Sequence, residues 1–370
     1  MNKNQTLKIN ILDKKNNYLN NKKTLKNVKI FNFNTKRFWS FDKKKYYNKN
    51  KYYLNHQIIE NPDLIERFDN LYIPPAYTNV IVAKSPNYKI QAIGIDTKGR
   101  KQYIYHPKFI QKQINNKYNK IIELGNKILK IENDNKKEIS NIINNPSNKL
   151  NFPDDYYPII LLLLLKYHFR IGNQKYEEDN NSFGITTLKK KHIIFLNNDD
   201  EFSIEFIGKK GVLNKITDKN ATIYNTLKKI INQNNNDCHI FCNYNQNNIK
   251  KIISPDDVSN YLKRKYNANI TPKMFRTWYA NYHLLSYLKD ISKNNPIIIR
   301  KKMSKKQINN LVKESSQYVS NKLNNTPTVS KKAYIDPEIL KMFLKNPSKF
   351  IQSIPDKKKD IHKHLQSIYR

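Results

Sequence analysis

Basic side chains account for most of the chemistry that this sequence offers. Lysine and arginine number 68 among 370 residues against 30 aspartates and glutamates, which leaves a formal net charge of +38. A compact protein with this charge repels itself unless a polyanion shares its surface. We therefore expect nucleic acid as the partner, because successive backbone phosphates meet many cations at once. A ribosome-bound or membrane-surface protein is the alternative that charge alone leaves open.

One short cluster has residue types that bind metals. Cys238 and Cys242 are the two cysteines of the chain, and His239 lies between them. A structural zinc site takes four such ligands. Because no second cluster supplies the others, we expect free thiols and neither a metal nor another cofactor. So few cysteines also indicate a reducing compartment rather than a secreted disulfide scaffold.

Nothing in the sequence indicates export or membrane insertion. The N-terminal MNKNQTLKIN is polar and lacks the apolar core of a signal peptide. The longest apolar run, Ile159 to Leu165, is much shorter than the roughly 20 residues that a membrane span requires. We therefore expect a soluble, intracellular protein without membrane contact.

The elements that must position the functional groups begin with two N-terminal segments. Residues 1–40 are rich in lysine and asparagine with weak periodicity, which predicts a basic low-complexity extension. Residues 41–107 are predicted to form a small antiparallel β-rich domain. Its strands are expected at residues 80–83, 90–95 and 101–105, with a turn at residues 96–99.

Residues 108–370 are predicted to form a larger, mostly α-helical domain. One helix is expected over residues 115–131, and a strongly apolar helix opens at Tyr157–Pro158 and brings Arg170 to its C-terminal end. Alternating apolar residues within 193–206 indicate a small sheet, whose exposed hairpin tip is GKKG at residues 208–211.

Two more helix starts consist of an N-cap residue followed by proline. They are Ser254–Pro255 and Thr271–Pro272, and the second places Arg276 about one turn into its helix. An amphipathic helix over residues 308–323 precedes a polar connection at residues 324–328. The predicted fold class is therefore α+β.

Four long blocks of the chain resemble type IB DNA topoisomerases, most closely the small poxvirus, giant-virus and bacterial group. They are residues 73–109, 170–192 (RIGNQKYEEDNNSFGITTLKKKH), 270–278 (ITPKMFRTW) and 323–337 (LNNTPTVSKKAYIDP). The blocks occur in the family's order and span about residues 65 to 340. Together they are far more specific than any single basic residue.

The resemblance implies a site of two arginines, a lysine, a histidine or asparagine, and a tyrosine nucleophile. The matching residues are Arg170, Arg276, Lys209, Asn325 and Tyr334. The neighbouring Lys210 leaves the register of the lysine open. Asn325 stands where poxvirus members carry histidine and where many bacterial members carry asparagine. An amide in that place can still donate to a phosphate oxygen.

These residue types suit the attack of a phenol oxygen on a DNA phosphodiester. The five-coordinate phosphorus carries extra negative charge, which the planar donor forks of the arginines can meet without a metal. The departing 5′-oxygen needs a proton from a general acid, for which Lys209 is the candidate. Because the 3′-phosphotyrosyl bond retains the energy for religation, the resemblance implies relaxation of supercoiled DNA without ATP.

Other residues are expected to hold double-stranded DNA. They are Arg100, Lys101, Gln102 and Tyr103 in the β-rich domain, and Lys175, Tyr176 and Lys273 in the helical domain. The resemblance implies that the two domains close around the duplex as a clamp. We expect a monomer without an obligate protein partner. The AT-biased composition suggests a large DNA virus, whose virion or replication compartment would then contain the enzyme.

Two other functions stay open at this level. A tyrosine recombinase shares this arrangement, although recombinases usually place a histidine three residues before the second arginine, where Lys273 stands. A catalytically inactive, basic DNA-binding protein could keep the same blocks. Single residues also have structural interpretations: Arg170 could cap the preceding helix, and Asn325 could be a turn residue.

Overall fold

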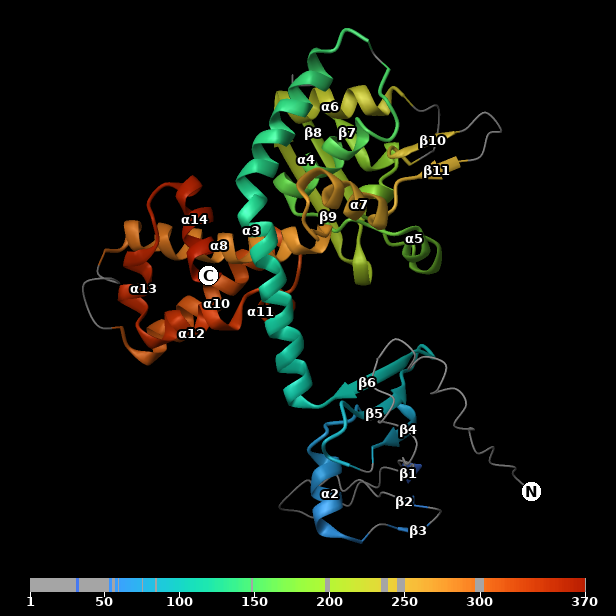
Figure 1. The fold of residues 1–370 in the computed structure, drawn as a ribbon, viewed down its shortest axis with the longest axis vertical. Helices are drawn as coiled ribbons and strands as arrows, with labels where there is room; N and C mark the ends of the chain where they lie inside the picture. Colours follow the sequence, from blue (N-terminus) through green and yellow to red (C-terminus); the bar gives the residue numbers. More distant parts are fainter. Residues whose placement is uncertain are drawn as a thin grey trace. The chain divides into compact units, whose positions relative to one another are not determined.

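The computed structural model describes residues 31–32, 53–54, 57–58, 60–74, 76–83, 85–147, 149–196, 200–233, 239–244, 250–296 and 303–369. Within these ranges the chain has the predicted α+β fold, with small antiparallel sheets and a larger helical part (Figure 1). It divides into two compact units, residues 1–115 and 116–370. The domain boundaries drawn from the sequence after residues 40 and 107 stay predictions.

The first unit contains a four-stranded antiparallel sheet with the order β1-β4-β5-β6. The strands are β1 (Phe31–Asn32), β4 (Thr78–Val82), β5 (Ile90–Ile95) and β6 (Lys101–Tyr105), and a separate pair is β2 (Tyr53–Leu54) with β3 (Gln57–Ile58). The sequence predicted the last three strands of the larger sheet but not β1. Apart from β1, residues 1–40 lie outside the described residues.

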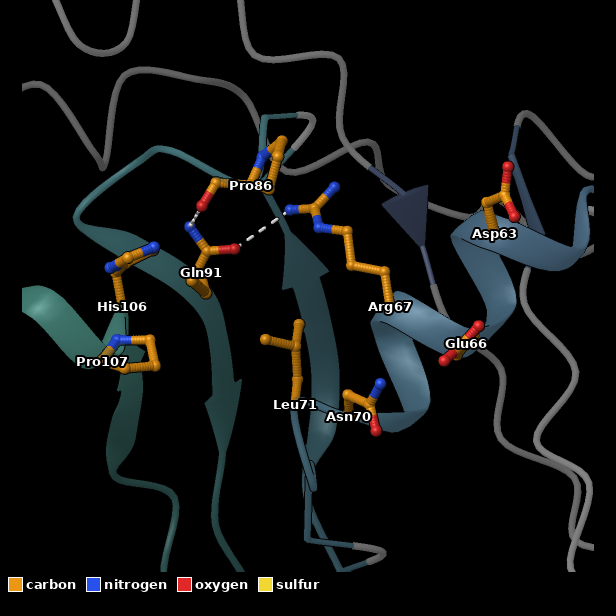
Figure 2. Close-up of a pocket in the computed structure, with 9 residues that line it drawn as sticks. All are labelled: Asp63, Glu66, Arg67, Asn70, Leu71, Pro86, Gln91, His106 and Pro107. Atoms are coloured by element: carbon orange, nitrogen blue, oxygen red, sulfur yellow. Dashed lines mark hydrogen bonds between the residues drawn. The ribbon is translucent and has the colours of Figure 1, made fainter.

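Helix α2 (Pro62–Asp69) packs on this sheet through Phe68, which joins Val80, Val82 and Ala92 in a small apolar core. Arg67 of α2 donates through Nη2 to the carbonyl of Ala83 at 2.7 Å and to Oε1 of Gln91 at 3.1 Å. Figure 2 shows this contact at the edge of an open hollow, where Gln91 also donates to the Pro86 carbonyl. The helix is thus attached to β5 by polar as well as apolar contacts.

Helix α3 (Pro107–Asn144) is much longer than the helix predicted over residues 115–131. Its buried side chains include Ile121, Leu124 and Ile128, and these produced the periodicity in the sequence. The flanking turns are largely polar and therefore carried little signal. The helix ends where the sequence breaks, before Pro146.

The predicted small sheet is present in the second unit as β7 (Ile193–Phe195), β8 (Glu201–Ile207) and β9 (Leu213–Lys219), all antiparallel. Its tip is a tight 3₁₀ turn over Lys209–Gly211, in which Lys210 has φ 66°. Phe206 of β8 packs edge-to-face on Phe169, which follows the apolar helix α4 (Tyr156–Tyr167). No helix in the described part of the chain is long and apolar enough to cross a membrane.

Helix α8 (Pro272–Asn294) has Phe275, Trp278 and Leu285 among its buried residues, and further helices complete the described part of the second unit. They are α5 (Gln174–Asn180), α6 (Ala221–Ile231), α7 (Pro255–Tyr266), α10 (Lys305–Leu323), α11 (Pro327–Ala333), α12 (Pro337–Lys345), α13 (Pro347–Ser353) and α14 (Lys358–Tyr369), with a hairpin β10 (Cys242–Tyr244) and β11 (Lys250–Ile252). Helices α10, α13 and α14 contact α8 directly. Because α11 begins at Pro327, the connection predicted at residues 324–328 is shorter than expected.

The packing of α3 against α8 leaves no room for a side chain at Gly125. A Cβ at this position would lie 2.7 Å from Cζ3 of the fully buried Trp278. We expect Gly125→Ala to lower the free energy of unfolding by about 1 kcal/mol, because overpacking outweighs the better helix propensity of alanine. Urea unfolding measures this, with the exposed Lys130→Ala on the same helix as control. An unchanged or higher stability would contradict the packing described.

Candidate active site

The candidate nucleophile, Tyr334, lies directly after the short helix α11. Thr326 caps the start of α11 by accepting from the Val329 amide, and the Tyr334 amide donates to the Ser330 carbonyl at 3.0 Å. The side chain is only 8% exposed. The sequence therefore forms a tight helical turn that ends with the phenol inside the protein.

Three consecutive backbone carbonyls around Tyr334 are each held by a buried or half-buried side chain. Lys117 donates to the Ala333 carbonyl at 2.7 Å, Asn281 to the Tyr334 carbonyl at 3.1 Å and Tyr118 to the Ile335 carbonyl at 2.8 Å. Asn281 also accepts from the Asp336 amide at 2.8 Å. Helices α3 and α8 thus fix the backbone on both sides of the phenol.

Arg276 contacts the phenol from α8. Its Nε lies 3.4 Å from Oη of Tyr334, and its guanidinium carbon is 5.2 Å from the centre of the phenol ring. Nη1 donates to the carbonyl of His168, and Nη2 donates to the carbonyl of Leu323 at 2.8 Å. A guanidinium has five N–H groups. One N–H on each terminal nitrogen therefore remains for a substrate oxygen.

Arg170 and Asn325 form a second pair beside the first. Nη2 of Arg170 donates to Oδ1 of Asn325 at 2.5 Å. Because a guanidinium can only donate, this contact fixes which end of the amide faces the arginine. The other end, Nδ2, is buried and has no hydrogen-bond partner within the structure. A buried donor without a partner is rare. Asn325 is thus left with a free donor inside the site.

The positive charges around Tyr334 lower the pKa of its phenol. Burial alone would raise the pKa of the phenol, but the charges of Arg276, Arg170 and Lys273 together outweigh burial, and the pKa lies below the ordinary value of tyrosine. Burial lowers the pKa of Arg276 to about 10, so this arginine stays charged at neutral pH. The arrangement therefore makes the phenol easier to deprotonate than an ordinary tyrosine.

Comparison with known proteins identifies the family of this chain. A family described as "Eukaryotic DNA topoisomerase I, catalytic core" matches residues 106–365, and "Bacterial DNA topoisomerase IB, N-terminal domain" matches residues 52–96. The chain belongs to the type IB DNA topoisomerase family. The resemblance predicted from the four sequence blocks is thereby confirmed, and the matched family is that of topoisomerases rather than recombinases.

Individual viral members of the family are similar over most of their length. The DNA topoisomerase 1B of Acanthamoeba polyphaga mimivirus is 30% identical over 313 residues, which are 83% of this chain and 88% of that protein. The DNA topoisomerase 1 of Rabbit fibroma virus (strain Kasza) is 26% identical over 85% of this chain and 91% of its own. The DNA topoisomerase 1B of Vaccinia virus (strain Copenhagen) is 26% identical over 76% and 82%.

The structure places four of the five predicted site residues together, whereas Lys209 lies apart from them. Lys209 is exposed at the tip between β8 and β9, and no hydrogen bond or ion pair joins it to Tyr334 among the described residues. Its ammonium lies 5.8 Å from the ring centre of Tyr176, a predicted DNA-contacting residue on α5. Lys175 is exposed one residue before Tyr176.

Two of the predicted DNA-contacting residues of the first unit contact an acidic residue that the sequence analysis did not single out. Asp96 forms an ion pair with Arg100 at 2.7 Å and accepts from Gln102 at 2.9 Å. The Arg100 contact lowers the pKa of Asp96. Tyr103 stacks on Tyr105, with ring centres 6.1 Å apart. Arg100 is therefore oriented within the protein before any DNA is bound.

The structure describes two members of the Cys/His cluster, His239 and Cys242. Cys238 lies outside the described residues, and Cys242 donates to the carbonyl of His239 at 2.9 Å. The His239 ring contacts Glu177 at 2.6 Å and Lys250 at 2.8 Å. No group of three potential metal ligands occurs among the residues with assigned positions.

Sequence analysis missed the residues that hold the site in place. Three of them, Lys117, Tyr118 and Asn281, donate to backbone carbonyls around Tyr334. The fourth, His168, accepts from Arg276 through its own backbone carbonyl. Tyr118 carried a signal only as a member of the apolar face of α3. Asn281 carried a second signal in the sequence, because it is a polar residue among the mostly apolar, buried residues of its helix.

Lys117 should make protein stability depend on pH. Burial, together with the charge of Lys273, lowers the pKa of Lys117 to about 8 from its ordinary value of 10.5. Between these values the unfolded chain binds more protons than the folded protein, so the free energy of unfolding rises with pH. The variant Lys117→Met should lack this pH-dependent part of the free energy of unfolding.

The measurement is urea unfolding of wild type and Lys117→Met at intervals from pH 8 to 10.5. The stability difference between the two proteins should grow in favour of wild type as pH rises. The exposed Lys120→Met on the same helix should show a constant difference. A constant difference for Lys117→Met as well would mean that Lys117 titrates as a solvent-exposed lysine does.

Proposed function

We propose that this chain relaxes supercoiled double-stranded DNA by cutting one strand through a covalent bond to Tyr334, allowing the cut strand to rotate, and resealing it. The observation that carries the proposal is the contact of the Tyr334 phenol with the buried guanidinium of Arg276. A phenol becomes a nucleophile when its proton is lost, and nearby cations favour that loss. The topoisomerase names of the viral relatives support the same activity.

In the cleavage step, Oη of Tyr334 attacks the phosphorus and the bond to the 5′-oxygen of the next nucleotide breaks. The products are a 3′-phosphotyrosyl bond and a free 5′-hydroxyl, so the number of ester bonds is unchanged. Religation is the reverse attack by that hydroxyl. Because one phosphodiester replaces another of similar energy, neither direction requires ATP.

Arg276 and Arg170 stabilise the charge that develops on the phosphate oxygens. The two remaining N–H groups of Arg276 point from terminal nitrogens that carbonyls already hold in place. Preorganised donors of this kind stabilise a transition state without reorganising during the reaction. Arginine supplies this charge at any relevant pH, so a divalent metal is not required.

Asn325 supplies a further donor to a phosphate oxygen. Its Oδ1 is occupied by Arg170, and its Nδ2 has no partner. A phosphate oxygen would satisfy this buried amide when DNA binds. The pair therefore acts as one unit, in which the arginine orients the amide.

Lys209 is the general acid of the proposed mechanism. The departing 5′-oxygen would be a strongly basic alkoxide, so it needs a proton as the bond breaks. The exposed ammonium at the β8–β9 tip can meet the DNA strand, and Tyr176 beside it contributes a ring face. Lys210 is the alternative general acid. Its backbone lies in the left-handed region, so the turn does not hold it in the same conformation as Lys209.

The basic surface supplies the affinity for DNA. We propose that both units contact one duplex as a clamp, with Arg100, Lys101, Gln102 and Tyr103 in the first unit and Lys175, Tyr176 and Lys273 in the second. A single chain contains all five proposed site residues, which supports a monomer without an obligate partner. The viral relatives support a setting in viral replication or in the virion.

The test is relaxation of a negatively supercoiled plasmid in EDTA without ATP. Wild type should produce a ladder of topoisomers, whereas Tyr334→Phe should bind the plasmid and relax nothing, because the attacking oxygen is absent. A denaturing gel should show covalent protein–DNA product for wild type alone. If both proteins retard the plasmid and neither relaxes it, the chain is an inactive DNA-binding protein.

The role of Asn325 can be tested with three substitutions that differ in charge and in hydrogen-bonding groups. Asn325→Asp keeps the acceptor for Arg170 but removes the donor, and Asn325→Ala removes both without adding a charge. We expect each to lower the relaxation rate by about 100-fold, as loss of one preorganised donor does. Asn325→His, which restores a donor, should retain more activity than either. Full activity of the alanine variant would show that the amide is only a turn residue.

A further inference from the structure

Two histidines outside the five-residue site lie directly behind it. His168 follows the last residue of α4, and its Nε2 lies 2.8 Å from Nε2 of His283 on α8. His168 is only 5% exposed. Neither histidine falls within the four blocks that resemble the family.

His168 has a backbone conformation that its residue type rarely adopts. Its φ of 54° and ψ of 27° lie in the left-handed region, and this turn ends α4. A non-glycine residue is strained in this region, so surrounding contacts must hold it. The backbone N–H donates to the Leu164 carbonyl at 3.2 Å, and ring atom Nδ1 lies 3.3 Å from the same oxygen.

These contacts define where the protons of the imidazole pair lie. A carbonyl oxygen only accepts, so Nδ1 of His168 carries the proton and its Nε2 is the acceptor. His283 must then donate from its own Nε2. Burial keeps the pKa of His168 well below its usual range, so the ring is neutral. Protons on Nδ1 of His168 and on Nε2 of His283 satisfy every contact named.

One face of α8 contacts His168 through three residues. Arg276, Tyr279 and His283 are spaced by three and four positions, which places them on the same side of the helix. Arg276 donates to the His168 carbonyl, the Tyr279 ring stacks on the imidazole with centres 4.3 Å apart, and His283 donates to its edge. Tyr279 is itself held by a hydrogen bond of 2.5 Å to Glu132 on α3.

We propose that His168 and His283 are positioning residues, whose imidazole pair locks the turn after α4 and thereby aligns both arginines of the site. The His168 carbonyl fixes Nη1 of Arg276, and the chain leaving the turn delivers Arg170, two residues on, to Asn325. The inference rests on the proposed cleavage by Tyr334. In this proposal neither histidine contacts the DNA phosphate. Their effect is on the rate of cleavage, because a displacement of about 1 Å in such a site costs up to 100-fold.

The test compares His168→Gly, His283→Leu and the double variant with wild type. Glycine accepts the left-handed turn and keeps the carbonyl but removes the imidazole, whereas His283→Leu leaves the turn residue unchanged. Plasmid relaxation at saturating enzyme in EDTA should slow by about 10- to 100-fold in each single variant, with unchanged retention of DNA on a gel. The double variant should be no slower than the slower single variant, because both remove the same contact.

Two further measurements separate positioning from a general loss of structure. Asn267→Gly changes another left-handed helix cap, that of α7, and should relax plasmid at the wild-type rate. Nitrogen NMR of the histidine rings should show wild-type His168 protonated at Nδ1 and His283 at Nε2. In His168→Gly the His283 signal should change while the protein keeps its far-ultraviolet circular dichroism.

The possible outcomes are distinct. If wild type relaxes plasmid and the two single variants do so equally fast, the inference fails while the proposed function stands. Losses that multiply in the double variant, or that follow a parallel loss of DNA retention, would also overturn it. If wild type itself relaxes nothing, the proposed function fails and the positioning role falls with it.

Discussion

The burial of the Arg276 guanidinium is the constraint on which the site depends. A cation that is only 3% exposed loses its hydration, and this loss is tolerable only if its N–H groups find acceptors. The acceptors are the carbonyl of His168, the carbonyl of Leu323 and the phenol of Tyr334. They belong to the ends of α4, α10 and α11. Satisfying one side chain therefore brings three chain segments together on α8, and the active site is assembled by the same contacts.

The groups that accept hydrogen bonds from Arg276 and Arg170 are neutral. The positive charge of the two arginines therefore remains available to a phosphate. Arg276 is held by carbonyls and a phenol, and Arg170 is held by the amide of Asn325. A carboxylate in any of these positions would cancel the positive charge that the reaction needs. Arg100 in the first unit shows the opposite arrangement, because Asp96 pairs with it directly. Such a pair orients the arginine but leaves less net charge for a reacting phosphate.

Different residues hold the backbone of the candidate nucleophile, Tyr334, and lower the pKa of its phenol. Lys117, Tyr118 and Asn281 bind the backbone carbonyls of residues 333–335 and make no contact with the phenol oxygen that the structure records. Among the described residues, the hydrogen-bond partner of the phenol oxygen is the guanidinium of Arg276, while Arg170 and Lys273 act on it through their charge. The tyrosine can therefore be placed rigidly while its acidity is set by cations on other elements. Helix α3, through Lys117 and Tyr118, is part of the support for the catalytic loop.

The sequence by itself determined the α+β class, the excess of positive charge, the helix starts at Ser254–Pro255 and Thr271–Pro272, and the family with its five candidate residues. The helix starts and the motif blocks could be predicted because each is formed by residues that lie close together in the sequence. Only the tertiary structure decided the orientation of the Asn325 amide, the three acceptors of Arg276 and the contacts of Lys117 and His168. Those contacts join residues separated by up to 216 positions, as Lys117 and Ala333 are, and no local pattern encodes them. The full length of α3 was missed for a related reason: its ends are polar, so they form a helix without the apolar periodicity that would predict one.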